Sequence, residues 1–259
     1  MNPELSFQNK VTLVTGSGRG IGKAIAMKFA QKGSDIVINY VRNKAQAEET
    51  SAQIRELGRK AIIIRADVSK IDSIDTLFQQ IEKEFGRLDF FISNAASGSN
   101  KPGMQQQPGG WDYTMNTNSR AFLFAAQCAA PLMEKQKGGV MLAITSPGSQ
   151  RVLPDYIAVG ASKAALESLV RYLAVELAPK NIVVNAISPG MVLTDALRYF
   201  QALSDEDMPQ KTIAATPSGR LVTPEDIANL AIFLCTPEAA MIRGQVIVID
   251  GGFTLPVRV

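Results

Sequence analysis

The sequence predicts an α/β domain built on a doubly wound, seven-stranded parallel sheet with helices on both faces. Short β-branched and aromatic runs alternate with amphipathic helical stretches along the whole chain. A glycine-rich run, TGSGRGIG at 15–22, directly follows the first of these runs. The chain has 259 residues, no internal repeat and no linker long enough to separate a pair of domains, so we expect a single domain spanning 1–259.

Seven strands are predicted in chain order, each a short run rich in β-branched residues between helical stretches. They cover residues 11–14, 35–40, 61–65, 90–93, 140–145, 182–187 and 245–250. Near-continuous hydrophobicity is typical of parallel strands that are buried on both faces. Right-handed crossovers between them then place ligands at the carboxyl ends of the strands.

Helices are predicted between these strands at 21–31, 44–57, 71–85 and 115–133. Pro224, followed by Glu225 and Asp226, marks a further helix start. Two intervening segments, 97–110 and 191–223, are predicted to be long surface loops. Because long loops in compact domains are more often functional than not, we expect both to act as substrate lids.

The charge pattern predicts neither a nucleic-acid partner nor a membrane partner. The 27 Lys and Arg residues are spread along the chain and exceed the 24 Asp and Glu residues by only three, which gives a net charge of +3. No segment reaches the roughly 18 apolar residues of a membrane span. The N-terminal residues lack the basic-then-apolar order of a signal peptide, so we expect a cytoplasmic protein.

The residue inventory also limits the chemistry. The chain contains no histidine, which removes His-dependent triads and most transition-metal sites, and we expect no metal. Cys128 and Cys235 lie in apolar stretches and are expected to be buried structural thiols. Acid–base work must therefore fall to Tyr, Lys, Asp or Glu.

The glycine run predicts a Rossmann-type dinucleotide site. Gly16, Gly20 and Gly22 follow the first strand and open the first helix, where glycine permits a tight turn and a close approach of the backbone to a pyrophosphate. Asp67 and Val68 close the third strand, and Asn94 and Ala95 close the fourth. The expected cofactor-binding residues in these three segments are Gly16, Ser17, Arg19, Gly20, Ile21, Asp67, Val68, Asn94 and Ala95.

The end of the second strand predicts NADPH as the cofactor. NAD specificity usually shows there as an acidic residue that bonds the adenosine ribose. This chain instead has Asn39, Tyr40, Val41 and Arg42, with no carboxylate. Arg42, together with Arg19 in the glycine run, could hold a 2′-phosphate.

Over essentially its whole length the chain resembles the short-chain dehydrogenases/reductases. The resemblance rests on TGSGRGIG, Asp67-Val68, SNAA, Asn118, Ser146, Lys163, Pro189-Gly190 and Asp250-Gly251-Gly252. It implies that Asn118 holds a water beside the lysine and that Ser146 bonds the substrate oxygen. It also implies that Lys163 binds the nicotinamide ribose, that Pro189 and Gly190 belong to the cofactor site, and that Thr194 contacts the nicotinamide carboxamide or the cofactor phosphates. A homotetramer is a further implication.

The chain departs from that family at the tyrosine. The usual pattern places a tyrosine four residues before the lysine, but this position holds Val159, and the nearest phenol is Tyr156, seven residues before Lys163. This spacing is similar to that of the enoyl-acyl carrier protein reductases. The segments NAASG, YLAVEL and MIRGQ resemble the Bacillus-type enoyl-acyl carrier protein reductase III.

These patterns favour NADPH-dependent reduction of the C2=C3 double bond of a trans-2-enoyl thioester, carried on acyl carrier protein or coenzyme A, in fatty acid or related acyl-chain synthesis. Hydride then adds to C3 while charge builds on the thioester oxygen, so the acid must stand further from the nicotinamide than in ketone reduction. If the segment is helical, Tyr156 and Lys163 share one face, and the wider spacing adds about 4.5 Å of rise. Two alternatives stay open: reduction of 3-oxoacyl thioesters or other ketones, and a non-catalytic nucleotide-binding relative.

Overall fold

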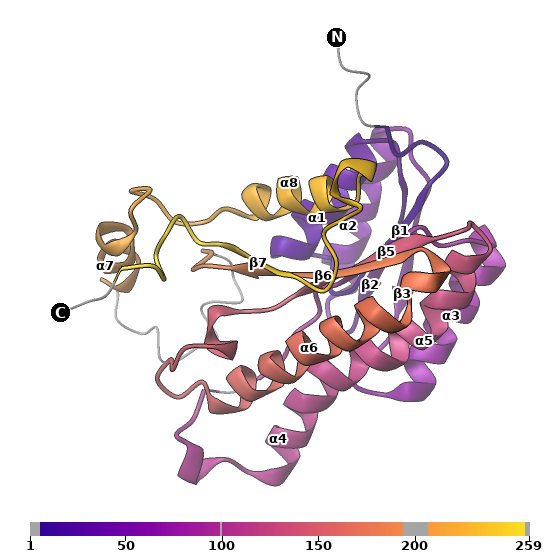
Figure 1. Cartoon of the computed structure of the whole chain (residues 1–259). Coiled ribbons are helices and arrows are strands. Elements are labelled where there is room, and N and C mark those ends of the chain that lie inside the picture. Colours follow the sequence, from indigo (N-terminus) through magenta and orange to yellow (C-terminus); the bar gives the residue numbers. More distant parts are fainter. Residues whose placement is uncertain (1–5, 99, 194–206, 257–259) are drawn as a thin grey trace.

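A computed structural model of the chain describes residues 6–98, 100–193 and 207–256. Its centre is one seven-stranded sheet with the strand order β3-β2-β1-β4-β5-β6-β7 (Figure 1). All six neighbouring pairs are parallel. The strands are β1 (Val11–Val14), β2 (Asp35–Tyr40), β3 (Ala61–Arg65), β4 (Phe90–Ser93), β5 (Gly139–Ile144), β6 (Ile182–Pro189) and β7 (Val246–Ile249). The predicted fold class is confirmed.

Two helical layers cover the sheet (Figure 1). The helices α1 (Gly20–Gln31), α2 (Lys44–Glu56) and α8 (Pro224–Leu234) pack on one face, and α3 (Ile71–Phe85), α5 (Ala121–Glu134) and α6 (Ile157–Glu176) pack on the other. Alternate strand residues enter different cores, since side chains of a strand alternate between faces. Leu13 belongs to the core under α3, α5 and α6, and the adjacent Val14 belongs to the core under α1, α2 and α8.

The predicted strands agree closely with the observed ones. The first four have the expected bounds, β5 lies one residue earlier, and β7 is shorter at both ends. β6 runs two residues further than expected, through Ser188 and Pro189, and all eight of its residues are buried. Its extension carries the chain into the region where we expected the nicotinamide to lie.

The predicted helix at 115–133 proved to start earlier. Helix α4 (Pro108–Met115) continues through a π-helical segment, Asn116–Arg120, directly into α5. The predicted loop at 97–110 thus ends at Gln107, with a short 3₁₀ turn at Gly103–Gln105. Gly109 and Gly110 hid this helix start because glycine disfavours helices, whereas Pro108 fits a first turn.

The second predicted loop, 191–223, contains the helix α7 (Met208–Ala215). Residues 194–206 of this segment lie outside the described residues of the chain. At its end, α8 begins at Pro224 as expected, and Thr223 caps it through a reciprocal pair of bonds with Asp226. The lid role of both segments stays a prediction.

The order of the strands fixes where a ligand can bind. The chain runs outward from β1 to β2 and β3, then returns to β4 on the other side of β1. In such sheets the carboxyl ends on either side of the reversal border a crevice. The segments after β1, β2, β3 and β4 therefore lie together at the carboxyl-terminal ends of the strands.

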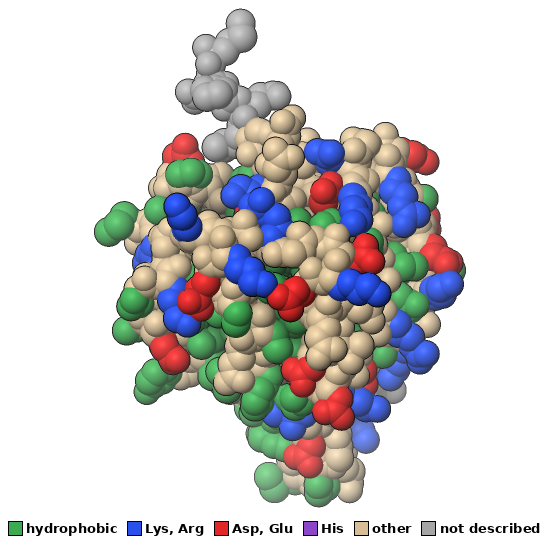
Figure 2. All heavy atoms as spheres, turned by 90° about the vertical axis from the view of Figure 1, so that its right-hand side faces the viewer, with side chains coloured by type: hydrophobic (Ala, Val, Ile, Leu, Met, Phe, Trp, Pro, Cys, Tyr) green, Lys and Arg blue, Asp and Glu red, His purple; other side chains and the backbone are tan. Residues whose placement is uncertain are grey.

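The surface shows mixed charge on the face drawn in Figure 2, where basic and acidic side chains are interspersed. Among the described helices, none has the length and hydrophobicity that a bilayer crossing requires. The described residues also contain no group of three acidic or cysteine side chains placed to bind a metal.

Candidate active site

The glycine run forms a tightly packed connection between β1 and α1. Gly16 and Gly20 have φ angles of +64° and +57°, which glycine adopts readily. A Cβ atom on Gly22 would lie 2.5 Å from both the carbonyl oxygen of Gly16 and Nδ2 of Asn94. Glycine at position 22 is therefore needed for helix α1 to pack this close to the loop.

Asn94 and Asn39 hold this loop from two sides. Asn94 Nδ2 donates to the carbonyl oxygens of Thr15 (2.9 Å) and Gly16 (3.2 Å). The buried Asn39, near the end of β2, accepts from the Gly16 amide at 3.2 Å. Ser17 is also buried and donates to the carbonyl of Val14 at 2.7 Å, so its side chain supports the loop from within.

This loop fits the pyrophosphate of a dinucleotide. The first amides of α1, at Gly20, Ile21 and Gly22, belong to the helical turn that leaves its N–H groups without intrahelical partners and attracts anions. Arg19 precedes the helix and Arg42 follows β2, and both are exposed. Because β1 and β2 pair in parallel, both arginines lie at the carboxyl-terminal end of the sheet.

The ends of the other strands carry the remaining expected residues. Asp67 accepts from the amide and hydroxyl of Ser69, both through Oδ1, so Oδ2 remains available to an adenine amine. Val68 is buried, and Ala95 donates its amide to Thr15 Oγ1 at 3.0 Å. Beyond β6, Gly190 bonds Ile249 and packs so closely that a Cβ would lie 2.9 Å from Cβ of Asp250. Pro189 ends β6, and Thr194 lies outside the described residues.

The structure brings Ser146 and Tyr156 together. Tyr156 precedes the first residue of α6, and its hydroxyl donates to Ser146 Oγ at 3.3 Å. Ser146 Oγ also accepts from the amide of Gly148 at 3.2 Å. A hydroxyl accepts two bonds and donates one, so the proton of Ser146 is left for a substrate oxygen. Burial raises the pKa of Tyr156, and the bond to Ser146 partly opposes this shift, so the phenol is protonated near neutral pH.

Two glycines allow this meeting. A Cβ on Gly148 would lie 2.6 Å from the ring of Tyr156, and a Cβ on Gly160 would lie 2.6 Å from the carbonyl oxygen of Gly148. The turn Pro147–Ser149 can therefore lie directly on the first turn of α6. Neither glycine was predicted from the sequence, although the Pro-Gly pair at 147–148 is a turn signal.

Lys163 lies deep in the same site. Its side chain is buried, and Nζ donates to the carbonyl of Ile144, two residues before Ser146, at 2.7 Å. Burial lowers the pKa of Lys163 to about 8, against an opposing effect of Glu167. An ammonium has three donors, so two remain for ribose hydroxyls.

Asn118 joins separate segments of the site through its side chain. It lies in the π-helical segment, a feature frequent at functional sites, and pairs with both the amide and the carbonyl of Ser97 at 2.8 Å. Its Nδ2 also donates to Ser162 Oγ, next to Lys163, at 2.9 Å. The expected water beside the lysine stays a prediction.

The position four residues before the lysine is closed to a phenol. Val159 is 3% exposed and packs against the loop after β4. A Cβ on Gly98 would lie only 2.2 Å from Cγ2 of Val159. Of the two positions, only 156 presents a hydroxyl to Ser146.

Comparison with known proteins shows the family to which this chain belongs. The family described as "Enoyl-(Acyl carrier protein) reductase" matches residues 16–254. The chain belongs to this enoyl-reductase-like family of short-chain dehydrogenases/reductases. It is therefore an oxidoreductase that uses a nicotinamide cofactor, and the residues around the glycine run fit one.

Relatives of this short-chain dehydrogenase/reductase act on different substrates. It is 37% identical to 1-cyclohexenylcarbonyl-CoA reductase of Streptomyces collinus over 96% of this chain and 88% of that protein. It is also 37% identical to 7α-hydroxysteroid dehydrogenase of Escherichia coli K12, over 96% and 95% of the two chains. A solved 7α-hydroxysteroid dehydrogenase in complex with NADH and 7-oxo glycochenodeoxycholic acid superposes with a TM-score of 0.91 at 35% identity, covering 98% of each chain. These similarities show the family of the chain and do not extend to the Bacillus type of enoyl reductase within it.

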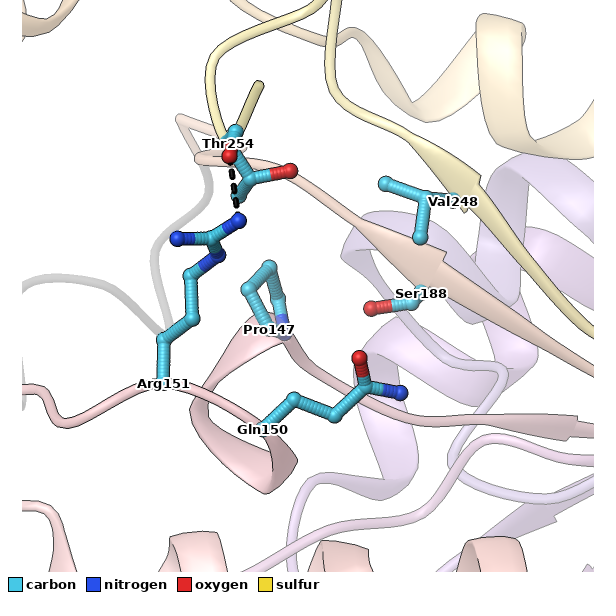
Figure 3. Close-up of a pocket in the computed structure, with 6 residues that line it drawn as sticks. All are labelled: Pro147, Gln150, Arg151, Ser188, Val248 and Thr254. Carbon is cyan, nitrogen blue, oxygen red and sulfur yellow. Dashed lines mark hydrogen bonds between the residues drawn. The ribbon is translucent and has the colours of Figure 1, made fainter. Parts of the chain in front are cut away.

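This oxidoreductase has a small pocket beside the turn Pro147–Ser149 (Figure 3). Pro147, Gln150 and Arg151 line it from the turn, and the guanidinium of Arg151 donates to the carbonyl of Thr254. Ser188 of β6 and Val248 of β7 form the opposite wall. The C-terminal segment thus supports the turn that carries Ser146 from the side away from α6.

Proposed function

We propose that this protein is an NADPH-dependent reductase of the C2=C3 double bond of trans-2-enoyl thioesters, carried on acyl carrier protein or coenzyme A. One observation carries the proposal. The phenol that meets Ser146 comes from position 156, seven residues before Lys163, while position 159 holds a buried valine.

The position of the phenol suits charge that develops away from the carbon that is reduced. Tyr156 adjoins the first turn of α6, and Lys163 lies nearly two turns further along the same helix. A tyrosine at position 159 would stand about 4.5 Å closer to the lysine along the helix axis. When bound, the reduced nicotinamide supplies a hydride, here to C3 of the enoyl group. On substrate binding the phenol of Tyr156 turns its single proton from Ser146 to the thioester oxygen, two carbons away, and Ser146 adds a second donor that stabilises the enolate.

Lys163 has two roles in this proposal. Its remaining donors bind the ribose hydroxyls, and its positive charge favours proton loss from the phenol. C2 is then protonated by Tyr156 or by water.

Similarity to known proteins supports the same reaction. The description of the matching family names an enoyl reductase. One relative is named as the reductase of a cyclohexenylcarbonyl thioester, whose ring double bond is conjugated with the thioester carbonyl. The resemblance of NAASG, YLAVEL and MIRGQ to the Bacillus type of enoyl reductase III agrees with this assignment.

A second candidate is reduction of a ketone such as a 3-oxoacyl thioester. The relative that acts on hydroxysteroids, and its solved complex with a 7-oxo bile acid, favour this reading. Tyr156 would then have to donate its proton to the oxygen on the same carbon that receives the hydride. A non-catalytic role fits less well, because Ser146, Tyr156 and Lys163 all converge on one site.

We propose that the protein uses NADPH and not NADH. The end of β2 has no carboxylate, and the exposed Arg19 and Arg42 lie at the same carboxyl-terminal end of the sheet. Arg42→Asp should reverse the preference, since a carboxylate repels a 2′-phosphate and bonds the ribose hydroxyls instead. The measurement is kcat/KM with NADPH and with NADH. An unchanged ratio would remove Arg42 from cofactor recognition.

The reaction itself is tested by following nicotinamide oxidation with trans-2-octenoyl-CoA and with 3-oxooctanoyl-CoA in separate assays. We expect turnover of the enoyl substrate and little of the oxo substrate. Turnover of the 3-oxoacyl thioester alone would establish the second candidate instead.

A further inference from the structure

Glu167 is a buried carboxylate in α6, one helical turn beyond Lys163, and the proposed reaction does not use it. It is 4% exposed, in a helix whose other buried residues are apolar or small apart from Lys163. Acidic side chains are almost never buried unless they are paired. Its partners therefore indicate what it does.

Among the described residues, the Glu167 carboxylate accepts three hydrogen bonds, and all three come from the segment that carries Ser146. Oε1 accepts from Thr145 Oγ1 at 2.8 Å and from Ser149 Oγ at 2.5 Å, and Oε2 accepts from Gln150 Nε2 at 3.2 Å. These residues lie on both sides of Ser146 in the sequence. The carboxylate thus fastens the catalytic turn to α6, the helix that also carries Lys163.

The Ser149 hydroxyl can give its single proton to the Glu167 carboxylate. The hydroxyl of Ser149 has a single proton but lies within reach of two acceptors, Glu167 Oε1 and the carbonyl of Ser146 at 2.8 Å. The amide of Ser149 already donates to that carbonyl at 3.0 Å, so the hydroxyl proton can go to the carboxylate. Charge-assisted bonds of this kind are about twice as strong as neutral ones.

Glu167 is also the charge that acts on Lys163 in the buried region, where it opposes the lowering of the lysine pKa by burial. Strands β5 and β6 and the turn Pro147–Ser149 contain no ionisable residue. The phenol of Tyr156 faces the same turn. The other ionisable groups on α6 and on the elements packed against it do not face Lys163. Three of them have partners elsewhere: Arg120 bonds Ser69, Cys128 bonds Asp75, and Glu134 pairs with Lys180. The rest are exposed, namely Asp112, Tyr113, Arg171, Tyr172 and Glu176. Arg151 and Asp155, which follow the turn, are exposed as well.

We propose that Glu167 is a positioning residue of the active site, which holds Ser146 opposite Tyr156 through Thr145, Ser149 and Gln150, one helical turn from Lys163. This inference deepens the proposed function and rests on it only for the identity of the substrate. Glu167 touches neither substrate nor cofactor; it acts through the turn and through the lysine.

Two substitutions separate the two effects. Glu167→Asp keeps the charge but withdraws the carboxylate by one methylene group from the turn. We expect kcat to fall about ten- to a hundredfold, because small misplacements of catalytic groups have effects of this size, with the pH profile unmoved. Glu167→Gln keeps the length and an acceptor oxygen but removes the charge. We expect the alkaline fall in activity to move to lower pH by about one unit, since Lys163 then loses its proton more easily.

The control is Glu176→Gln, at the exposed end of the same helix, which should change neither property. The dissociation constant of NADPH, measured by fluorescence, should stay within about twofold of wild type in all variants. If the Glu167 variants do not fold, Ser149→Ala decides, because it removes one bond to the turn and should lower kcat with an unmoved pH profile. Wild-type kcat and pH profile in both Glu167 variants, or a wild-type kcat in Ser149→Ala where those variants fail to fold, would overturn the proposal.

The assay uses whichever thioester the wild-type protein reduces, so a failure of the proposed substrate leaves this test intact. If the wild-type protein reduces neither thioester, the titration of Lys163 decides. It is followed by NMR of protein with ¹³C-labelled lysine, and the signal is assigned by its loss in Lys163→Met. A lower pKa of Lys163 in Glu167→Gln than in wild type supports the proposal, and equal values overturn it.

Discussion

Tyr156 is the residue on which the assignment depends, and its replacement tests that role. Tyr156→Phe removes the hydroxyl but keeps the ring that packs on Gly148. We expect kcat to fall about 10²–10³-fold, the usual effect of losing a donor to a developing oxyanion. Binding of NADPH should be unchanged. Steady-state kinetics and a cofactor titration measure the two quantities, and a near-normal kcat would show that another group is the donor.

The pKa of Lys163 predicts an alkaline limit to activity. Burial lowers this pKa to about 8, so the ammonium is present at neutral pH and is lost as the pH rises through about 8. Tyr156 keeps its proton over the same range, because burial raises its pKa. We therefore expect kcat/KM to fall above about pH 8. A profile that is flat to pH 10, which a free lysine would give, is the contrary result.

At the scale of residues, the sequence identified most of the groups that meet in the site but not what holds them. The motifs pointed to Ser146, Tyr156 and Lys163, and the structure brings these residues into one region. The close packing at Gly148 and Gly160 and the buried bonds of Glu167 depend on a turn lying against a helix. Such contacts join residues that no local periodicity connects.

At the scale of elements, the junction of β1 with α1 gives a prediction about cofactor binding. Gly22→Ala should raise the dissociation constant of NADPH at least about tenfold, or about 1.4 kcal/mol, because the added methyl would lie 2.5 Å from the Gly16 carbonyl and displace the loop. Gly109→Ala, where nothing lies within 4 Å of the added atom, is the matched control. Equal affinities in the two variants would separate this loop from the cofactor site. Thermal unfolding shows whether both variants are folded.

The capping box of α8 gives a prediction about stability. Thr223→Ala removes the side chain that accepts from the Asp226 amide at 3.1 Å. We expect a loss of about 1 kcal/mol in the free energy of unfolding, and a Tm lower by about 2–4 °C. Thr76→Ala, in the middle of α3, is the control, because that threonine caps no helix end. Calorimetry of the two variants makes the comparison, and equal Tm values would mean that the cap contributes nothing.

Elements with a strong pattern could be predicted, and those defined by tertiary contacts could not. The runs at β1 to β4 gave correct bounds because short stretches rich in β-branched and aromatic residues favour strands. Helix α4 was missed because of Gly109 and Gly110, and the π-helical segment Asn116–Arg120 has no sequence signature. That segment presents Asn118 to Ser97 and Ser162, an arrangement set by packing.

At the scale of the whole molecule, the sequence predicted the parallel sheet and the end of it at which ligands bind. Alternating strands and helices allow few right-handed topologies. The assembly remains a proposal. We propose a homotetramer, and light scattering of the purified protein should give four times the monomer mass. A monomeric mass at micromolar concentration would contradict it.

The central claim is that this site reduces a carbon–carbon double bond. The most direct test offers the protein an equimolar mixture of trans-2-octenoyl-CoA and 3-oxooctanoyl-CoA with limiting NADPH, and identifies the products by mass spectrometry. We expect octanoyl-CoA as the main product, formed about 10²–10³-fold more slowly by Tyr156→Phe. Accumulation of 3-hydroxyoctanoyl-CoA, with the enoyl thioester left intact, would contradict the claim.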